Sequence, residues 1–148
     1  MRQNSMQGLR EWLDALALSL EPAQAKQLMQ SLAQGLRVRT RQRINAQRDP
    51  DGNRFIPRKR DQLGRIRREA MFNKLPRQLK TQYSSEHAAV GLASRNAFIA
   101  RVHQYGLNDR PSRSQQPVRY ARRELLGFST DDQTWAMQQI REFISQRL

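Results

Sequence analysis

The sequence predicts an α+β protein in which helices outweigh strands. Apolar residues recur at helical spacing near both ends of the chain. The turn-forming run DPDG at 49–52 ends the first helical region and precedes an extended stretch rich in arginine. Short apolar stretches within 79–92 and at 118–120 are typical of short strands. We therefore expect an N-terminal helical hairpin, a basic extended arm, a small antiparallel sheet with a short packed helix, and a C-terminal amphipathic helix.

Length and composition predict one domain over residues 1–148 with a single modest core. Only 37% of the residues are hydrophobic and the mean hydropathy is −0.88, so the surface of a partner is an option for completing the core. The chain has no cysteine and only two histidines, which excludes disulfide scaffolds, thiol nucleophiles and the usual zinc ligand sets. No apolar run suits a signal peptide or a membrane span, so we expect a soluble protein made in the cytoplasm.

The N-terminal hairpin is predicted from two apolar stripes. A cap at Asn4 or Ser5 starts the first helix, and Pro22 favours the start of the second. The residues of the two stripes are Leu9, Trp12, Leu13, Leu16 and Leu20, followed by Ala25, Leu28, Met29, Leu32 and Leu36. The second stripe continues into Arg39 and Arg43, so this end of the helix is expected to project towards water, acidic side chains or phosphates.

The remaining elements follow from turn and cap chemistry. Residues 46–62 form a basic turn and extended arm, after which a third short helix from Leu63 to Leu75 is stopped by Pro76. Strands at 79–83 and 88–92 form a hairpin. A helix capped by Ser94 ends at Gly106, residues 107–117 form a flexible loop, and Val118 and Tyr120 begin another extended piece. Ser129 and Asp132 form a capping box before the last helix.

The chemical motifs argue against an enzyme and against a metal site. In DPDGN the glycine stands at the fourth position instead of the sixth, and the twelfth residue is Arg60 where a calcium loop needs a bidentate glutamate. His103 could titrate near neutrality, but no nucleophile, acidic pair or phosphate-binding loop joins it in the sequence. We therefore expect no catalytic residues, no metal and no cofactor, and a structural role for His103.

Positive charge is the strongest compositional feature. The net charge is +14, and residues 37–80 alone hold fifteen basic and four acidic residues. Guanidinium groups pair with phosphates and with carboxylates alike, so contact with DNA and contact with an acidic protein both remain open. The candidate contact residues are Arg37, Arg39, Arg41, Arg43, Arg58, Lys59, Arg60, Arg65, Arg67 and Arg68.

Three segments follow one another along the chain: RINAQRDPDGNRFIP at 43–57, NAFIARVHQYG at 96–106 and VRYARRELLGFSTDD at 118–132. Together they resemble the phage virion morphogenesis family, the tail completion proteins of contractile-tailed phages. The resemblance runs from about residue 30 onward. By this resemblance the family-signature residues are Asp49, Pro50, Gly52, His103, Tyr105, Gly106, Arg123, Leu125, Leu126 and Gly127. We interpret their roles as structural, in turns, caps and strand packing.

The resemblance also implies a function. It predicts a virion structural protein of the tail or neck, assembled in the host bacterial cytoplasm, that completes the tail end and joins it to the head connector. A hexameric ring around the DNA passage is implied, with tail terminator, tail tube or head-connector proteins as partners, DNA nearby and no membrane. The net charge of +14 supports one alternative, a non-specific DNA-binding accessory protein.

Overall fold

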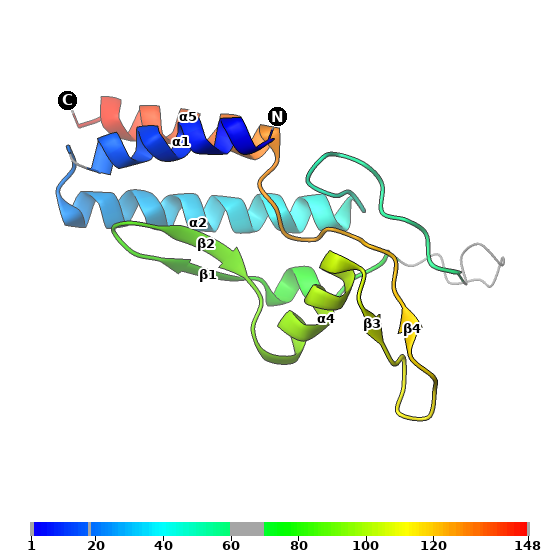
Figure 1. Ribbon diagram of the computed structural model, residues 1–148. Coiled ribbons are helices and arrows are strands. Elements are labelled where there is room, and N and C mark those ends of the chain that lie inside the picture. The colour runs from blue at the N-terminus through cyan, green and yellow to red at the C-terminus, as the bar shows by residue number, and fades with distance from the viewer. Residues whose placement is uncertain (1, 18, 60–69, 148) are drawn as a thin grey trace. The chain divides into compact units, whose positions relative to one another are not determined.

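The computed structural model describes residues 2–17, 19–59 and 70–147 and confirms an α+β fold (Figure 1). Two small two-stranded sheets accompany the helices, one pairing β1 with β2 and the other β3 with β4. The elements in chain order are α1 (Arg2–Ala17), α2 (Pro22–Asn45), the 3-10 helix η1 (Leu75–Gln78), β1 (Lys80–Tyr83), β2 (Ala88–Gly91), α4 (Ser94–Tyr105), β3 (Asn108–Asp109), β4 (Val118–Arg119) and α5 (Thr130–Ser145).

The chain packs as two compact units. Unit 1 contains Met1–Arg39, Lys80–Val90 and Phe128–Leu148, and unit 2 contains Thr40–Leu79 and Gly91–Gly127. Each unit has its own cluster of buried apolar residues, so the expectation of a single core is wrong. The long helix α2 contributes its first part to unit 1 and its last residues to unit 2. The assignment of residues 1–148 to one domain stays a prediction.

Unit 1 is a layer of helices with a β-hairpin. Figure 1 shows α1, α2 and α5 running alongside one another, with the hairpin β1–β2 along α2. Leu28, Leu32 and Ile140 lie at the centre of its core, and Tyr83 and Ala88 of the hairpin pack against that core. The predicted apolar stripes of the second and last helices therefore meet in one core, as amphipathic helices require.

The start of α5 carries the predicted capping box. The Ser129 hydroxyl accepts a hydrogen bond from the Asp132 backbone N–H at 2.9 Å, and the Asp132 carboxylate accepts one from the Ser129 N–H at 3.1 Å. Asp132 is only 4% exposed and also binds Arg39, whose Nε lies 2.7 Å from its Oδ1. This carboxylate therefore ties the start of α5 to α2 within unit 1.

Two local predictions, the cap of the first helix and the third helix, differ from the structure. Helix α1 already begins at Arg2, so Asn4 and Ser5 do not cap it. Residues 70–74 are not helical, and η1 begins at Leu75 with Pro76 in its first turn, where the fixed φ of proline suits a helix start. The other part of the predicted third helix, at 63–69, lies outside the described residues.

The predictions around α4 need a similar correction. The N-cap of α4 is Ala93 and no side-chain cap is formed, so Ser94 does not cap this helix. The segment 107–117, expected as a loop, begins with strand β3, in which Asn108 pairs with Arg119 of β4. Among the described residues, no helix is both long enough and apolar enough to cross a membrane.

Candidate assembly surface

Unit 2 brings together the three sequence segments that were singled out for their resemblance, apart from residues 128–132 of the third, which lie in unit 1. The first provides the end of α2 and the following turn, the second provides α4, and the third provides β4 and the chain after it. Side chains of the first two segments form hydrogen bonds with the backbone of the third: Arg43 donates to a carbonyl, and Gln104 accepts from two N–H groups. The three segments therefore build one structure, and its surface is the candidate functional site.

The turn after α2 is held by one aspartate. The Asp49 Oδ1 accepts hydrogen bonds from the backbone N–H groups of Asp51 and Asn53, each at 2.9 Å. Gly52 follows with φ of +86°, a conformation that glycine adopts without strain. The Asp49 carboxylate is thus used by the turn itself. Within the described part of the chain, no group of three or more potential metal ligands lies together.

The same turn packs against Gly127, the last residue of unit 2. A Cβ on Gly127 would lie 2.4 Å from the Pro50 Cγ and 3.0 Å from its Cβ. The φ of Gly127 is not in the left-handed region. Glycine is therefore needed here because of the close approach of the turn, and not because of the backbone conformation. Pro50 is itself buried. Two of the predicted signature residues therefore act as one packing pair.

Gly106 ends α4 in the left-handed conformation, with φ of 64° and ψ of 52°. Its backbone N–H donates to the Val102 carbonyl, which is the C-cap that the sequence predicts. A Cβ at this position would come within 3.1 Å of the Tyr120 carbonyl oxygen and of the Arg122 nitrogen. Gly106 therefore serves both the helix end and the approach of the following chain.

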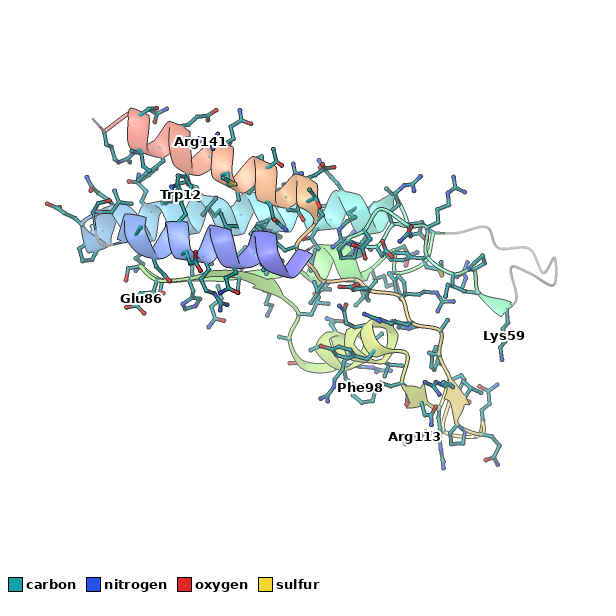
Figure 2. The ribbon with its side chains drawn as sticks, turned by 45° about the horizontal axis from the view of Figure 1, so that its top comes forward. Trp12, Lys59, Glu86, Phe98, Arg113 and Arg141 are labelled. Carbon is teal, nitrogen blue, oxygen red and sulfur yellow. The ribbon has the colours of Figure 1, made fainter. Side chains whose placement is uncertain are left out.

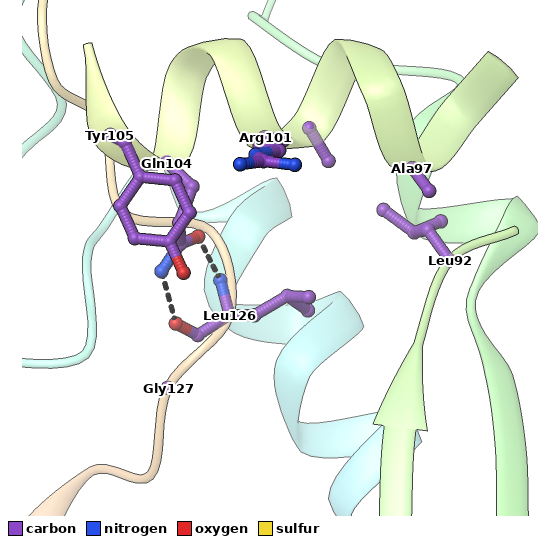
Figure 3. A pocket seen from close by; sticks show the side chains of 8 residues that line it. Leu92, Ala97, Arg101, Gln104, Tyr105, Leu126 and Gly127 are labelled. Carbon is purple, nitrogen blue, oxygen red and sulfur yellow. Dashed lines mark hydrogen bonds between the residues drawn. The ribbon is translucent and has the colours of Figure 1, made fainter. Parts of the chain in front are cut away.

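Gln104 clamps the chain after β4 to helix α4 (Figure 3). Its Oε1 accepts hydrogen bonds from the N–H groups of Leu125 and Leu126 at 2.8 and 2.9 Å, and its Nε2 donates to the Leu126 carbonyl at 2.7 Å. Both the oxygen and the nitrogen of its side-chain amide thus form hydrogen bonds with the backbone of this segment. Sequence analysis missed Gln104, because nothing in a lone glutamine shows which distant backbone it will meet.

Replacing Gln104 with leucine is expected to lower the free energy of unfolding by about 2–4 kcal/mol, because three backbone groups in a half-buried place lose their partner. Gln104→Glu keeps the acceptor for the two N–H groups but sets a carboxylate oxygen against the Leu126 carbonyl in place of the donor, so we expect a smaller loss than with leucine, though still a loss. Urea unfolding of both variants measures the difference. Equal stability of Gln104→Leu and the wild-type chain would contradict this role.

Two predicted contact or signature arginines are used inside unit 2. The Arg43 guanidinium donates to the carbonyls of Leu125 at 2.8 Å and Arg48 at 3.1 Å. Arg123 is 6% exposed and donates to the carbonyls of Ile56 at 2.6 Å and Pro57 at 3.2 Å. Arg123 thereby ties residues 56–57 of the arm to the third segment. Charge-assisted hydrogen bonds of this kind are stronger than neutral ones.

His103 is the centre of a row of aromatic rings. Its ring centroid lies 4.7 Å from that of Phe72 and 5.0 Å from that of Tyr120, both edge to face. Burial lowers the pKa of His103 from 6.5 to about 4, the Arg123 charge lowers it too, and Asp109 acts in the opposite direction. Its Nδ1 is buried and has no hydrogen-bond partner in the part of the chain that the structure describes. His103 is therefore a neutral, packed ring at physiological pH.

The lowered pKa of His103 makes stability depend on pH. The unfolded chain takes up this proton near pH 6.5, whereas the folded chain does so only near pH 4. The contribution to stability is therefore present above pH 6.5 and is lost as the pH falls towards 4. We expect His103→Phe to lose less stability than the wild-type chain between pH 7 and pH 5, measured as the urea midpoint. His87→Gln, at an exposed histidine, is the control that should behave as wild type.

The remaining predicted contact residues lie at the surface or outside the described residues. Arg37, Arg41 and Lys59 are exposed and Arg58 is partly buried, whereas Arg39 is paired with Asp132 as described above. The residues that lie outside the described part are Arg60, Arg65, Arg67 and Arg68. Figure 2 shows the side chain of Lys59 pointing away from the ribbon. Their role in partner contact stays a prediction.

Folding concentrates the positive charge in one unit. Unit 2 holds nineteen basic and six acidic residues, a net charge of +13, whereas unit 1 holds eight and seven, a net charge of +1. Residues 91–127 add seven basic and two acidic residues to those of the middle of the chain. The positive charge of unit 2 therefore comes from residues 91–127 as well as from the basic stretch at 37–80.

Unit 2 also carries two grooves. The α4 groove, about 720 Å³ in volume, is lined by Leu92, Ala97, Ala100, Arg101, Gln104, Tyr105, Leu126 and Gly127 (Figure 3). The signature residue Tyr105 is 62% exposed at its edge. The second groove, here called the arm groove, has a volume of about 810 Å³. It is lined by residues 56–59 of the arm, by Met71 and Phe72, by His103 and Pro111, and by residues 118–121 and Arg123.

Comparison with known proteins gives a match over nearly the whole chain. The model of the phage virion morphogenesis family matches residues 4–148. The tail completion protein S of Escherichia phage P2 is 34% identical to this chain, and the aligned region covers 95% of each chain. A comparison with solved structures gives no match. The expected resemblance is confirmed, and the chain belongs to the phage virion morphogenesis family.

Proposed function

We propose that this chain is a non-catalytic structural component that completes the end of a phage tail and joins it to the head connector. The observation that carries the proposal is the similarity to the tail completion protein S of phage P2. This similarity covers 95% of the chain and therefore extends over both compact units. The packing supports the same role. The side chains of Asp49, Gln104 and Arg123 form hydrogen bonds with the chain's own backbone. These bonds hold unit 2 in a fixed conformation, on which the surrounding cations are displayed.

We further propose that the chain acts as a ring, with six copies around the DNA passage. Copies in a ring meet through heterologous contacts, in which one patch of a subunit binds a different patch of the next. Chains of net charge +14 repel one another, so such a ring needs negative charge from elsewhere. DNA in the passage or acidic surfaces of tail terminator, tail tube or connector proteins would supply it. Assembly would take place in the host cytoplasm and end in the virion.

Electron microscopy of particles made without this chain tests the proposal. Finished heads and finished tails that remain separate would support a role in completion and joining, and restoring the gene should restore whole particles. Normal infectious particles in its absence would overturn the proposal. Purified particles from the restored strain should contain the chain, and quantitative mass spectrometry of the particles would give its copy number relative to a tail protein.

Charge reversal in the arm should block assembly without unfolding the chain. We expect the double variant Arg58→Glu and Lys59→Glu to lower the yield of infectious particles by about tenfold or more, because four charge units change at a contact with an acidic partner. The matched control is Arg10→Glu with Lys26→Glu, at exposed positions of unit 1. Plaque titres and thermal melting of the purified variants measure the two effects. Equal titres for the two double variants would remove the arm from the mechanism.

The concentration of charge in unit 2 also favours a second candidate, a non-specific DNA-binding accessory protein. Such a protein would bind duplex DNA of any sequence with a steep dependence on salt. Tight duplex binding by the free chain would favour this candidate only together with normal head-to-tail joining in particles that lack the chain. Separate heads and tails would favour the structural role, whatever the affinity for DNA.

A further inference from the structure

The arm groove of unit 2 combines an apolar surface with a rim of positive charge. Ile56, Phe72, Val118 and Tyr120 provide apolar surface, and Lys59 and Arg119 provide exposed cations. Ile56 is 50% exposed and Val118 is 39% exposed, which leaves large aliphatic surface in contact with water. None of the described residues that line the groove is acidic. These features call for an occupant with both an apolar side chain and negative charge.

The groove is built by contacts that fix its walls. Arg123 holds the carbonyls of Ile56 and Pro57, so one wall is tied to the chain after β4. The β3–β4 ladder pairs Asp109 with Val118, which positions the opposite wall. The His103 ring packs edge to face against the rings of Phe72 and Tyr120, and these contacts hold the aromatic part of the groove in place. The site is therefore largely preformed, which limits the entropy lost when a partner binds.

We propose that the arm groove binds a segment of a partner protein in which an apolar side chain is flanked by carboxylates. The apolar side chain would cover Ile56 and Val118, and the carboxylates would pair with Lys59 and Arg119. Burial of apolar surface supplies affinity, and the rim charges supply orientation and selectivity. This inference rests on the proposed assembly role, because it identifies the kind of partner that unit 2 would meet in the particle.

DNA is the less suitable occupant of this groove. Phosphates would satisfy the cations but would leave the aliphatic surface of Ile56 and Val118 uncovered. Bases bind single-stranded sites by stacking on open aromatic faces. Here Phe72 and Tyr120 are partly buried and already pack around His103. A protein segment therefore fits the observed mixture of surface better than a nucleic acid does.

Fluorescence anisotropy with the isolated full chain tests the inference. The labelled probe is the peptide EELFEE, and the control peptides are EESSEE, which lacks apolar side chains, and SSLFSS, which lacks charge. We expect EELFEE to bind at least about tenfold more tightly than either control. Val118→Ser and Arg119→Glu should each weaken its binding by about fivefold or more. Their matched controls, Phe98→Ser and Arg113→Glu, change exposed residues of unit 2 outside the groove and should have little effect (Figure 2).

Several results would overturn the inference. They are equal binding of EELFEE and EESSEE, equal effects of groove and control variants, or no binding of EELFEE at about 1 mM. A labelled DNA duplex that is bound more tightly and is weakened by the same groove variants would identify the site as a DNA site. If Arg119→Glu fails to fold, as shown by circular dichroism, Lys59→Glu replaces it.

Particle assays separate this inference from the proposed function. Normal particle yield with Val118→Ser and Arg119→Glu, together with joining defects when the whole chain is absent, would reject the groove as an assembly site and leave the proposed function intact. Peptide binding that follows the expected pattern, together with normal particles in the absence of the chain, would reject the proposed function instead.

Discussion

Replacing Leu125 with alanine is expected to lower the free energy of unfolding by about 3–5 kcal/mol, because the lost side chain leaves a cavity in a closed core. Leu125 is 0% exposed and belongs to the core of unit 2 with Ile44, Phe55, Leu75 and Ala100. Its backbone is held on both sides, by the Gln104 Oε1 at its N–H and by Arg43 at its carbonyl. The surrounding chain therefore has little freedom to collapse into the space.

The adjacent leucine is the natural control for this prediction. Leu126 is partly exposed and lines the α4 groove, so Leu126→Ala should cost about 1 kcal/mol. Urea unfolding of both variants measures the difference, and plaque titres at raised temperature should fall for Leu125→Ala first. Similar stabilities for the two variants would show that Leu125 is not the centre of this core.

The contrast between these two leucines shows where sequence analysis stops. Both stand in the run RELLG, and nothing in the run says which one faces the core. The chain here has no regular helix or strand, so no periodicity assigns a side chain to a face. The assignment depends on Gln104 and Arg43, which are 21 and 82 residues away along the chain. Long-range partners of this kind leave no local pattern.

Local chemistry, in contrast, was predicted well. The capping box at Ser129, the left-handed Gly106 and the turn at Asp49 and Gly52 are all confirmed, because each depends on residues a few positions apart. The predicted cap at Ser94 is wrong, although serine is a favoured cap. Local preference is a weak guide where the neighbouring chain decides the backbone conformation, and Ser94 has a φ of 54°.

The basic surface was only partly predictable. Counting charges along the chain correctly identifies residues 37–80 as the basic region. It does not show that Arg39 and Arg43 are used within the chain, by a carboxylate and by backbone carbonyls. It also does not show that residues 91–127 join the same unit. Both facts arise from tertiary packing, which decides whether a cation meets solvent or the chain's own acceptors.

A further large effect on stability is expected at Gly35, in the part of α2 that belongs to unit 1. A Cβ at this position would lie 2.1 Å from the Trp135 Cη2 and 2.3 Å from its Cζ2. An indole ring cannot bend away as the end of a flexible side chain can, so Gly35→Ala forces α5 or the ring to move. We expect it to lower the free energy of unfolding by about 2–3 kcal/mol. Urea unfolding followed by tryptophan fluorescence measures the loss of stability.

Gly8 provides a matched control with the opposite sign. It also lies within a helix, α1, but a Cβ there would meet nothing within 4 Å. Alanine is the better helix former, so Gly8→Ala should raise the free energy of unfolding by about 0.5–1 kcal/mol. A gain in stability from both substitutions would mean that Trp135 does not pack on Gly35. Opposite signs would show that the same residue type weakens one helix and allows close packing in another, because only at Gly35 does a neighbouring ring occupy the place of the missing side chain.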